Sequence, residues 1–334
     1  MNTATDIPPA PSTTARSSWG QECVRWLPLA FALVPFALLI FVLPYAAGYA
    51  DFRRTIFRML MTSWADPTWQ HGALALPMAC FLGWRRRSEL AALEPKPSIW
   101  GLFLGVFAMA LYWAGYRGNF YYFGYAAIQL SVAALILWLW GWRHFRILIF
   151  AWFILGFAWP YLFLEDTLAF KLRFLMVTVT AKVLNIASVE TIQDGTRLIS
   201  AATATKAQGE WFQLNVDGPC SGLRSLFALI MVSALFGYFR QRTFWRQALL
   251  FAASIPLAIM ANMIRILVLI GATMTFGQEF ALGKGEEYTS NFHLITGIAV
   301  FVVALGGLLG VETLLNRVFG REKPKPYLGG GRQP

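Results

Sequence analysis

Long apolar runs, separated by short polar stretches, follow one another along most of the chain. A helix of about 20 apolar residues spans the hydrocarbon core of a bilayer. Eight runs approach or exceed this length, at residues 26–45, 69–84, 98–116, 120–142, 145–164, 222–239, 244–275 and 293–315. The pattern predicts an all-α polytopic membrane protein with about eight transmembrane helices.

The interval 165–219, between the fifth and sixth runs, has a different pattern. Its residues 168–186 alternate apolar side chains with three basic ones, which is typical of an amphipathic helix on a membrane surface. The Asp-Gly pair at 194–195 separates two β-prone runs and predicts a β-hairpin. The segment "EWFQLNV" predicts a further strand, which leads toward Cys220. We therefore expect a small extracytoplasmic amphipathic helix and β-hairpin before this cysteine.

Composition and charge agree with a membrane protein. Of the 334 residues, 57% are hydrophobic and only 13% are charged. The net charge of +11 could indicate a nucleic-acid partner, but the basic residues gather at the ends of the apolar runs. Such an arrangement encodes membrane topology. We expect contact with membrane lipids and no binding of nucleic acid.

The chain divides into three expected regions. Residues 1–20 are polar and rich in Pro, Ser and Thr, which predicts a disordered cytoplasmic N-terminus without a cleavable signal peptide. Residues 21–320 form one multi-pass membrane domain, and residues 321–334 form a basic cytoplasmic tail. Sixteen Lys and Arg residues lie on the connections that share a side with both termini, against ten on the opposite side. This bias predicts cytoplasmic termini and an extracytoplasmic position for the interval 165–219.

Cys220 is the first candidate for chemistry. It lies in "NVDGPCSGLRSL", where a polar turn leads into an apolar helix, and it is the one cysteine assigned to the outer side. A helix N-terminus and a nearby cation both favour the reactive thiolate form. Arg224 follows four residues later and shares a face with Cys220 if the turn is already helical. The alternative is a small buried hydrophobic side chain, as most free cysteines are.

Arg265 is the second candidate. It interrupts the apolar run "PLAIMANMIRILVLIGA", with Asn262 one turn before it. An arginine at the centre of a spanning helix costs about 2.5–3.5 kcal/mol and is by default a sign of function. About ten residues separate it from the expected outer end, which at 1.5 Å per residue predicts a depth near mid-membrane, unless the helix breaks at Gly271 or bends at Pro256. A structural ion pair or a snorkelling side chain is the alternative.

Two of the three histidines share a side with Cys220. His144 is assigned to the cytoplasmic side, whereas His293 opens the last apolar run and His71 lies near the outer end of the second. Either of the two outer histidines could accept the thiol proton. No Cys or His residues have the spacing of metal ligands, and no nucleotide-binding loop is present, so we expect neither a metal nor a cofactor.

At these residues the sequence resembles the exosortase/archaeosortase family of membrane cysteine transpeptidases. The resemblance lies in "PCSGLRSL", "ANMIRIL" and "NFHLITG", in this order, and in the earlier segment "WQHGALALPMACFLGWRRRSEL". Together with the hairpin before the cysteine, these motifs cover most of residues 60–315.

The resemblance implies a catalytic set of Cys220, Arg265 and His293. From their positions in the sequence we expect Arg224, Asn262 and His71 to support this set. The resemblance also implies exported substrate proteins whose C-terminal sorting tail consists of a short motif, an apolar helix and a basic end. Cys220 would form a thioester, Arg265 would stabilise the oxyanion or hold a carboxylate of the motif, and His293 would act as general base and then acid. A lipid or a glycan would be the acyl acceptor, and a bacterial inner membrane the location.

Two other readings of these residues stay open. A transporter or scaffold could use Arg265 as a binding site, although paired inverted halves, which would favour a transporter, are not found in the sequence. A plain intramembrane cysteine protease would pass the acyl group to water.

Overall fold

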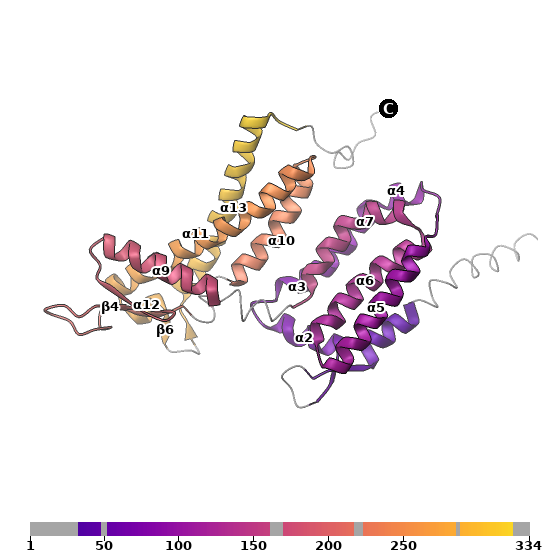
Figure 1. Ribbon diagram of the computed structural model, residues 1–334. Helices are drawn as coiled ribbons and strands as arrows, with labels where there is room; N and C mark the ends of the chain where they lie inside the picture. Colours follow the sequence, from indigo (N-terminus) through magenta and orange to yellow (C-terminus); the bar gives the residue numbers. More distant parts are fainter. Residues whose placement is uncertain (1–32, 48–51, 161–169, 217–222, 285–287, 323–334) are drawn as a thin grey trace, which may run out of the picture. The chain divides into compact units, whose positions relative to one another are not determined.

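The computed structural model describes residues 33–47, 52–160, 170–216, 223–284 and 288–322 (Figure 1). Among these residues, four helices are long and apolar enough to cross a membrane: α5 (Ile99–Gly118), α6 (Tyr121–Leu139), α11 (Phe244–Phe276) and α13 (Asn291–Phe319). Shorter apolar helices cover Leu33–Val42 and Leu226–Arg240. The structure therefore confirms a mostly helical multi-pass membrane protein, with four long spans in its described part. The count of about eight stays a prediction.

The chain divides into two compact units. The first unit comprises residues 1–62 and 80–152, and the second unit comprises residues 63–79 and 153–334. The boundaries between them fall inside three helices, which are α2 (Ile56–Ala65), α3 (His71–Arg85) and α7 (Trp142–Leu155).

The first unit is built around the antiparallel helix hairpin α5–α6 (Figure 1). Its other elements are η1 (Leu38–Val42), β1 (Pro44–Ala46), β2 (Arg54–Thr55) and α4 (Arg87–Ala91). The two helices approach closely because Gly101 has no side chain, and a Cβ there would lie 2.4 Å from the backbone nitrogen of Trp138. At the other end, Asn119 makes the tight turn in the left-handed conformation, with φ of 58°.

A polar pair joins α6 to α7 inside the first unit. The side-chain amide of Gln129 donates to the carbonyl of Trp152 (2.6 Å), and the indole of Trp152 donates back to the carbonyl of Gln129 (2.7 Å). Since hydrocarbon offers no partner for such groups, this reciprocal pair lets α6 carry a buried amide.

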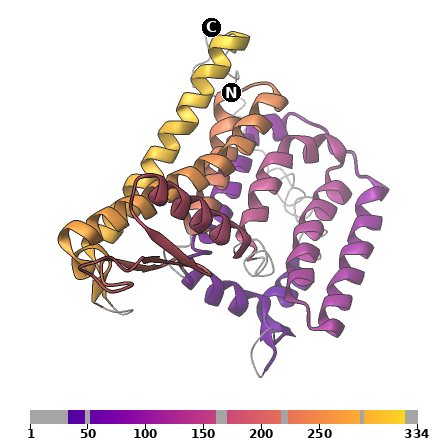
Figure 2. The ribbon, with the colours of Figure 1, turned by 60° about the vertical axis from the view of Figure 1, so that its left-hand side comes forward.

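The second unit contains a bundle of three helices, α10 (Leu223–Arg240), α11 and α13 (Figure 2). Their shared core consists of small and branched apolar side chains, namely Leu226, Leu229, Ala258, Ala261, Val300 and Ala304. A second cluster of Leu250, Leu308 and Leu315 continues the packing toward the other end of the helices. The three runs expected to carry the functional residues therefore form one packed body.

Beside this bundle, α9 (Phe170–Ile186) and a three-stranded sheet cover the last turns of α11. The strands are β3 (Thr191–Asp194), β4 (Arg197–Ser200) and β5 (Gln213–Asn215), antiparallel in the order β3-β4-β5. Their common core is apolar and contains Val177, Leu184, Leu198, Phe212, Leu214, Ile266 and Ile270. The expected helix and hairpin are both present. The turn comprises Gly195 and Thr196, one residue later than the Asp-Gly signal indicated, because Asp194 pairs with Arg197.

The remaining elements of the second unit connect these parts. They are η2 (Gly156–Ala158), α12 (Gln278–Ala281), β6 (Gly283–Lys284) and β7 (Tyr288–Thr289). The short β6–β7 hairpin returns the chain from the end of α11 to the start of α13.

At the opposite end of the bundle, five polar residues form what we call the clamp cluster: Arg240, Gln241, Arg246, Glu312 and Glu322. The buried carboxylate of Glu312 accepts from Arg240 (2.9 and 3.2 Å) and from Gln241 (3.3 Å). Arg246 donates to the last carbonyls of α13 and pairs with Glu322 at 3.4 Å. The clamp cluster therefore ties the α10–α11 turn to the end of α13.

Candidate functional site

Arg265 and His293 contact each other between α11 and α13. The guanidinium nitrogen Nη2 of Arg265 lies 2.8 Å from the ring nitrogen Nε2 of His293, and it also donates to the carbonyl of His293 at 3.3 Å. A guanidinium can only donate hydrogen bonds. Nε2 of His293 is therefore the acceptor and carries no proton, which leaves the proton of the neutral ring on Nδ1.

The first turn of α13 holds His293 in place. Ser290 is the N-cap residue, and its hydroxyl oxygen accepts from the backbone N–H of His293 at 3.0 Å. The same hydroxyl donates to the carbonyl of Ala281 (2.9 Å), which joins α12 to this turn. The hydroxyl of Thr296 donates to the carbonyl of His293 at 2.9 Å. His293 is buried, with 5% of its surface exposed, so its ring is held on several sides.

Gly297 makes room for the guanidinium of Arg265. It lies one turn after His293 on the same face of α13. A Cβ at this position would lie 3.4 Å from Nη2 and 3.6 Å from Cζ of Arg265. The guanidinium therefore lies over the backbone of Gly297, and a Cβ there would already be in van der Waals contact with it.

Asn262 connects Arg265's helix to α9. Its side chain is buried, and its amide nitrogen lies 3.3 Å from the sulfur of Met176. One turn later, Ile266 belongs to the core that α11 shares with α9 and the sheet. The segment of α11 on both sides of Arg265 is therefore fixed by protein contacts.

These contacts bear on the position of Arg265 along α11. The helix continues past Gly271 to Phe276, and its last turns pack against α9 and the sheet. Measured from the clamp cluster, Arg265 lies nineteen residues beyond Arg246, and His293 lies nineteen residues before Glu312. At 1.5 Å per residue each interval is about 28 Å, close to the thickness of about 30 Å of a hydrocarbon core. Arg265 and His293 thus lie at the same distance along α11 and α13 from the clamp cluster, and this distance is close to one hydrocarbon thickness.

His71 lies beside the first turns of α10. Its ring stacks on Phe227 at 5.7 Å between centroids, and Trp69 stacks on the same ring at 4.9 Å. Its Nδ1 lies 3.2 Å from the carbonyl of Thr68. The structure therefore brings His71 to α10, whereas it brings His293 to Arg265.

The glycine next to His71 has a packing role. The indole of Trp64 donates to the carbonyl of Ala158 at 2.9 Å, and a Cβ on Gly72 would lie 2.7 Å from that indole nitrogen. In the His71-Gly72 pair, the histidine ring thus packs against Phe227 of α10, and the glycine lets the indole of Trp64 come close to the backbone.

Cys220 lies outside the described residues, as does the side chain of Arg224. Helix α10 begins at Leu223, three residues after Cys220, and Leu226 packs in one core with Ala261 and Val300. Ala261 is one turn before Arg265, and Val300 is two turns after His293. The helix that follows Cys220 therefore begins near the level of the Arg265–His293 pair.

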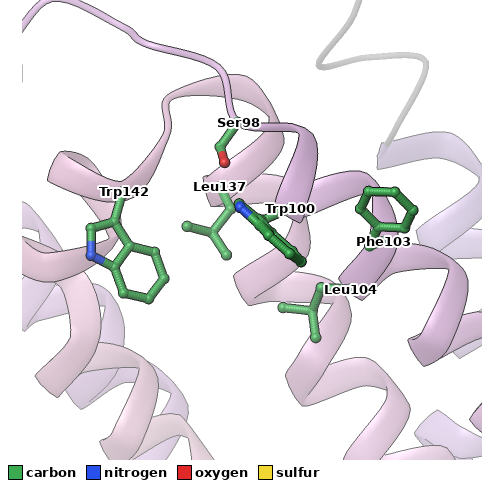
Figure 3. A pocket seen from close by; sticks show the side chains of 6 residues that line it. All are labelled: Ser98, Trp100, Phe103, Leu104, Leu137 and Trp142. Atoms are coloured by element: carbon green, nitrogen blue, oxygen red, sulfur yellow. The ribbon is translucent and has the colours of Figure 1, made fainter.

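A cavity in the first unit offers little chemistry. It has a volume of about 660 Å³ and is lined by Ser98, Trp100, Phe103, Leu104, Leu137 and Trp142 (Figure 3). These side chains are aromatic or aliphatic apart from one hydroxyl. In the described ranges no group of three or more His, Cys, Asp or Glu residues could hold a metal ion.

Sequence reasoning identified Arg265 and His293 but missed Ser290 and Gly297. Ser290 had a local signal, since a serine directly before an apolar run is a preferred N-cap. Gly297 also had one, because it lies four residues from His293 and so on the same helix face. The site as described can donate charged hydrogen bonds through Arg265 and move a proton through His293.

One comparison with known proteins identifies a family. Residues 63–310, about three quarters of the chain, match the model of the family described as "Transmembrane exosortase (Exosortase_EpsH)". No curated protein and no solved structure matches the chain.

Proposed function

The chain belongs to the transmembrane exosortase family, and we propose that Cys220, Arg265 and His293 together make it a cysteine transpeptidase. Membership of this family implies a membrane enzyme that processes proteins carrying a sorting tail. The observation that carries the catalytic assignment is the 2.8 Å contact between Arg265 and His293 on two separate helices. It unites a cation and a proton acceptor in an otherwise apolar part of the bundle.

In the first step Cys220 attacks the substrate. Its sulfur bonds to the carbonyl carbon of the scissile peptide, and the thiol proton moves to the ring of His293. The carbonyl oxygen becomes an oxyanion, which the guanidinium of Arg265 stabilises. Removal of one such donor typically costs about 2.7–4 kcal/mol of transition-state stabilisation.

The contact between Arg265 and His293 implies an order of events within this step. While Nη2 of Arg265 donates to Nε2 of His293, that nitrogen has no lone pair for the thiol proton. Arg265 must first turn toward another acceptor, such as the substrate carbonyl or a carboxylate of the sorting motif. Binding of substrate then frees the base at the moment when the oxyanion needs its donor.

In the second step the C–N bond breaks. The leaving amine takes the proton from His293, and the acyl group stays on Cys220 as a thioester. A hydroxyl or amine of the acceptor then attacks the thioester while His293 takes its proton. The sulfur leaves, recovers this proton and becomes a thiol again. A lipid or a glycan as acceptor gives transpeptidation, and water gives hydrolysis.

The depth of the pair supports a membrane-anchored substrate. The pair lies about 28 Å along the helices from the clamp cluster. A tail helix of about 20 apolar residues with a basic end would span the same layer. Its preceding motif would then emerge at the level of Arg265 and His293. With the expected topology, the termini are cytoplasmic and the site faces outward across a bacterial inner membrane.

His71, Arg224 and Asn262 are proposed to support the reaction. His71 contacts α10 through Phe227, so it is the alternative base for Cys220. Asn262 fixes the turn of α11 before Arg265 through its contact with Met176. Arg224 lies one turn after Cys220 in the sequence and would favour its thiolate.

The experiment that tests this function uses an exported reporter protein with a C-terminal sorting tail from the same genome. It is co-expressed with the wild-type chain, with Cys220→Ala, or with the matched control Cys80→Ala. We expect wild type and the control to remove the tail, and Cys220→Ala to leave it intact while accumulating in the membrane. The mass of the product distinguishes water from another acceptor. Equal processing by all three would favour a transporter or scaffold that uses Arg265 as a binding site.

A further inference from the structure

One end of the first unit carries four arginines, Arg53, Arg54, Arg58 and Arg117, which we call the arginine patch. They come from two segments, residues 44–62 and 112–125, that contain a single acidic residue in their sequence, Asp51. The patch lies where α5 ends and α6 begins, at one end of a membrane-spanning helix hairpin (Figure 1). In the expected topology this is the outer side, where basic residues are disfavoured.

Arg53 is held against the end of α5. Its guanidinium lies over the ring of Tyr116 at 4.1 Å and donates to the carbonyl of Tyr45 at 3.1 Å. The hydroxyl of Tyr45 donates to the carbonyl of Tyr112 (3.0 Å), and Asn119 accepts from the backbone N–H of Ala47 (2.8 Å). These contacts fix the β1–β2 hairpin on α5, so Arg53 lies beside the turn that bears Arg117.

The other arginines continue the patch. Arg54 follows Arg53 directly, lies over the ring of Phe52 at 5.5 Å, and has a buried Nε without a hydrogen-bond partner among the described residues. Arg58 begins α2 nearby, where its backbone N–H donates to the hydroxyl of Thr55. Within the described ranges, no carboxylate pairs with any of the four guanidinium groups. Four cations thus remain without an anionic partner from the described protein.

Exposed aromatic side chains surround the patch. Phe52 is 63% exposed, Trp113 is 64% exposed and Phe120 is 45% exposed. Aromatic residues at the ends of spanning helices lie at the level of the lipid headgroups. The arginine patch is therefore at the depth where the phosphates of the leaflet lie.

We propose that the arginine patch binds the phosphate group of an anionic phospholipid. The planar guanidinium matches phosphate oxygens with paired hydrogen bonds, and an arginine is less strongly hydrated than a lysine. Phospholipids surround the end of a membrane-spanning hairpin. Their phosphate groups can supply the anionic partner that the described residues do not give to the four arginines. Three of the four arginines, at positions 53, 54 and 58, precede residues 63–310, whereas Arg117 lies inside the part of the chain that matches the family.

The test is a lipid titration of the full chain in detergent micelles, followed by native mass spectrometry. Phosphatidylglycerol and phosphatidylcholine are compared as the first lipid bound. A double variant combines Arg58→Gln with Arg117→Gln. It removes the charges of two side chains that make no hydrogen bond to a described residue. We expect wild type to prefer phosphatidylglycerol, and the double variant to bind it about twenty-five-fold more weakly, at about five-fold for each arginine. Binding of phosphatidylcholine should not change.

A matched control removes the same charge at the other end of the first unit. Arg143 and Arg146 are exposed near the start of α7, and their double replacement by Gln should leave the first binding event unchanged. An equal loss in both double variants would overturn the proposal, as would equal affinity of wild type for the two lipids. Displacement of phosphatidylglycerol by millimolar inorganic phosphate would also overturn it, because the site would then bind a free anion.

A third variant separates specific recognition from general attraction. Arg53→Lys keeps the charge but loses the planar group that stacks on Tyr116. We expect an intermediate loss of affinity for phosphatidylglycerol. If Arg53→Lys and the double variant both bound phosphatidylglycerol as tightly as wild type does, the arginine patch would not be the lipid site.

Discussion

Nη2 of Arg265 lies 2.8 Å from Nε2 of His293, although the two residues belong to different helices and are 28 positions apart in the sequence. In this contact the guanidinium of Arg265 donates to Nε2 of His293, which is the nitrogen that would accept a proton if His293 acts as a general base. In the proposed mechanism, His293 therefore cannot accept the thiol proton of Cys220 until Arg265 donates to another acceptor. This link between substrate binding and proton transfer leads to specific expectations for both residues.

Substitution of Arg265 should slow the reaction without removing the protein from the membrane. Arg265→Gln loses the charge that stabilises the oxyanion, so we expect processing to fall by about 10²–10³-fold. Arg265→Lys keeps a charge on a shorter side chain and should recover only part of the rate. Single-turnover processing of a purified reporter measures both. Full activity of Arg265→Gln would exclude an oxyanion role.

The two outer histidines should differ in importance. We expect His293→Gln to abolish processing, because the proton acceptor beside Arg265 is lost, and His71→Gln only to weaken it. The readout is the fraction of reporter processed at equal enzyme abundance. The opposite ranking would assign the general base to His71, whose ring contacts α10 through Phe227.

Gly297 should act as a positioning residue for Arg265. In Gly297→Ala the new Cβ would lie 3.4 Å from Nη2, at the near edge of ordinary van der Waals contact, so at most a small loss of rate is expected. Gly297→Val displaces the guanidinium, and a misplacement of about 1 Å can cost about 10²-fold. The rate at saturating substrate and its pH profile are the measurements, since a change in the Arg265–His293 contact alters both.

Two glycines of the same helix provide the control for Gly297. A Cβ at Gly306 or Gly310 would meet no atom within 4 Å. Alanine at either position should therefore leave the rate and the pH profile as in wild type. If these variants slow processing as much as Gly297→Ala, the effect belongs to the helix and not to Arg265.

Ser290 should stabilise the start of α13. Ser290→Ala removes both the N-cap of His293 and the bond to Ala281, and loss of an N-cap typically costs about 1 kcal/mol. We expect a lower unfolding temperature together with slower processing. The comparison is Thr313→Ala, because that hydroxyl is exposed and donates within the same helix to Leu309. Slower processing in both variants would argue against a specific role of Ser290.

The clamp cluster should make stability depend on pH through Glu322. Burial opposes ionisation of Glu322, but hydrogen bonds from the Thr243 hydroxyl and from the backbone of Arg242 and Thr243, with the charge of Arg246, lower its pKa below the usual 4.5. A carboxylate whose pKa is lower in the folded state stabilises the fold above its unfolded pKa. That stability is lost as the pH falls through the folded pKa.

Unfolding temperatures of wild type and Glu322→Gln in detergent measure this contribution. We expect wild type to be more stable by a constant amount above pH 4.5, and the difference to vanish progressively at lower pH. A difference that persists unchanged in acid would show that Glu322 acts without its charge. The control is Glu94→Gln, which removes an exposed carboxylate outside the clamp cluster.

Much of this architecture follows from local pattern. The long helices α5, α6, α11 and α13 coincide with apolar runs, because a membrane span needs only length and apolar composition. The β3–β4 hairpin follows from the Asp-Gly signal, with the turn shifted by one residue. The packing of the end of α11 against α9 and the sheet did not follow, because no local pattern in the sequence encodes it.

The site was predictable as a set of residue types but not as a geometry. Arg265 and His293 stood out because charged and titratable groups are rare in apolar helices. Their direct contact depends on how α11 and α13 pack, which no local spacing encodes. The room that Gly297 leaves for the guanidinium becomes meaningful only once that packing is known.

The acyl group on Cys220 is the most direct test of the proposed mechanism. Wild-type enzyme and Cys220→Ala are incubated with a tail-bearing reporter, quenched in acid, and digested for mass spectrometry of the peptide that contains residue 220. We expect wild type to carry the reporter's new C-terminus on Cys220 in a linkage that hydroxylamine cleaves, and Cys220→Ala to carry none. Tail removal by Cys220→Ala at the wild-type rate would contradict a thioester at this residue.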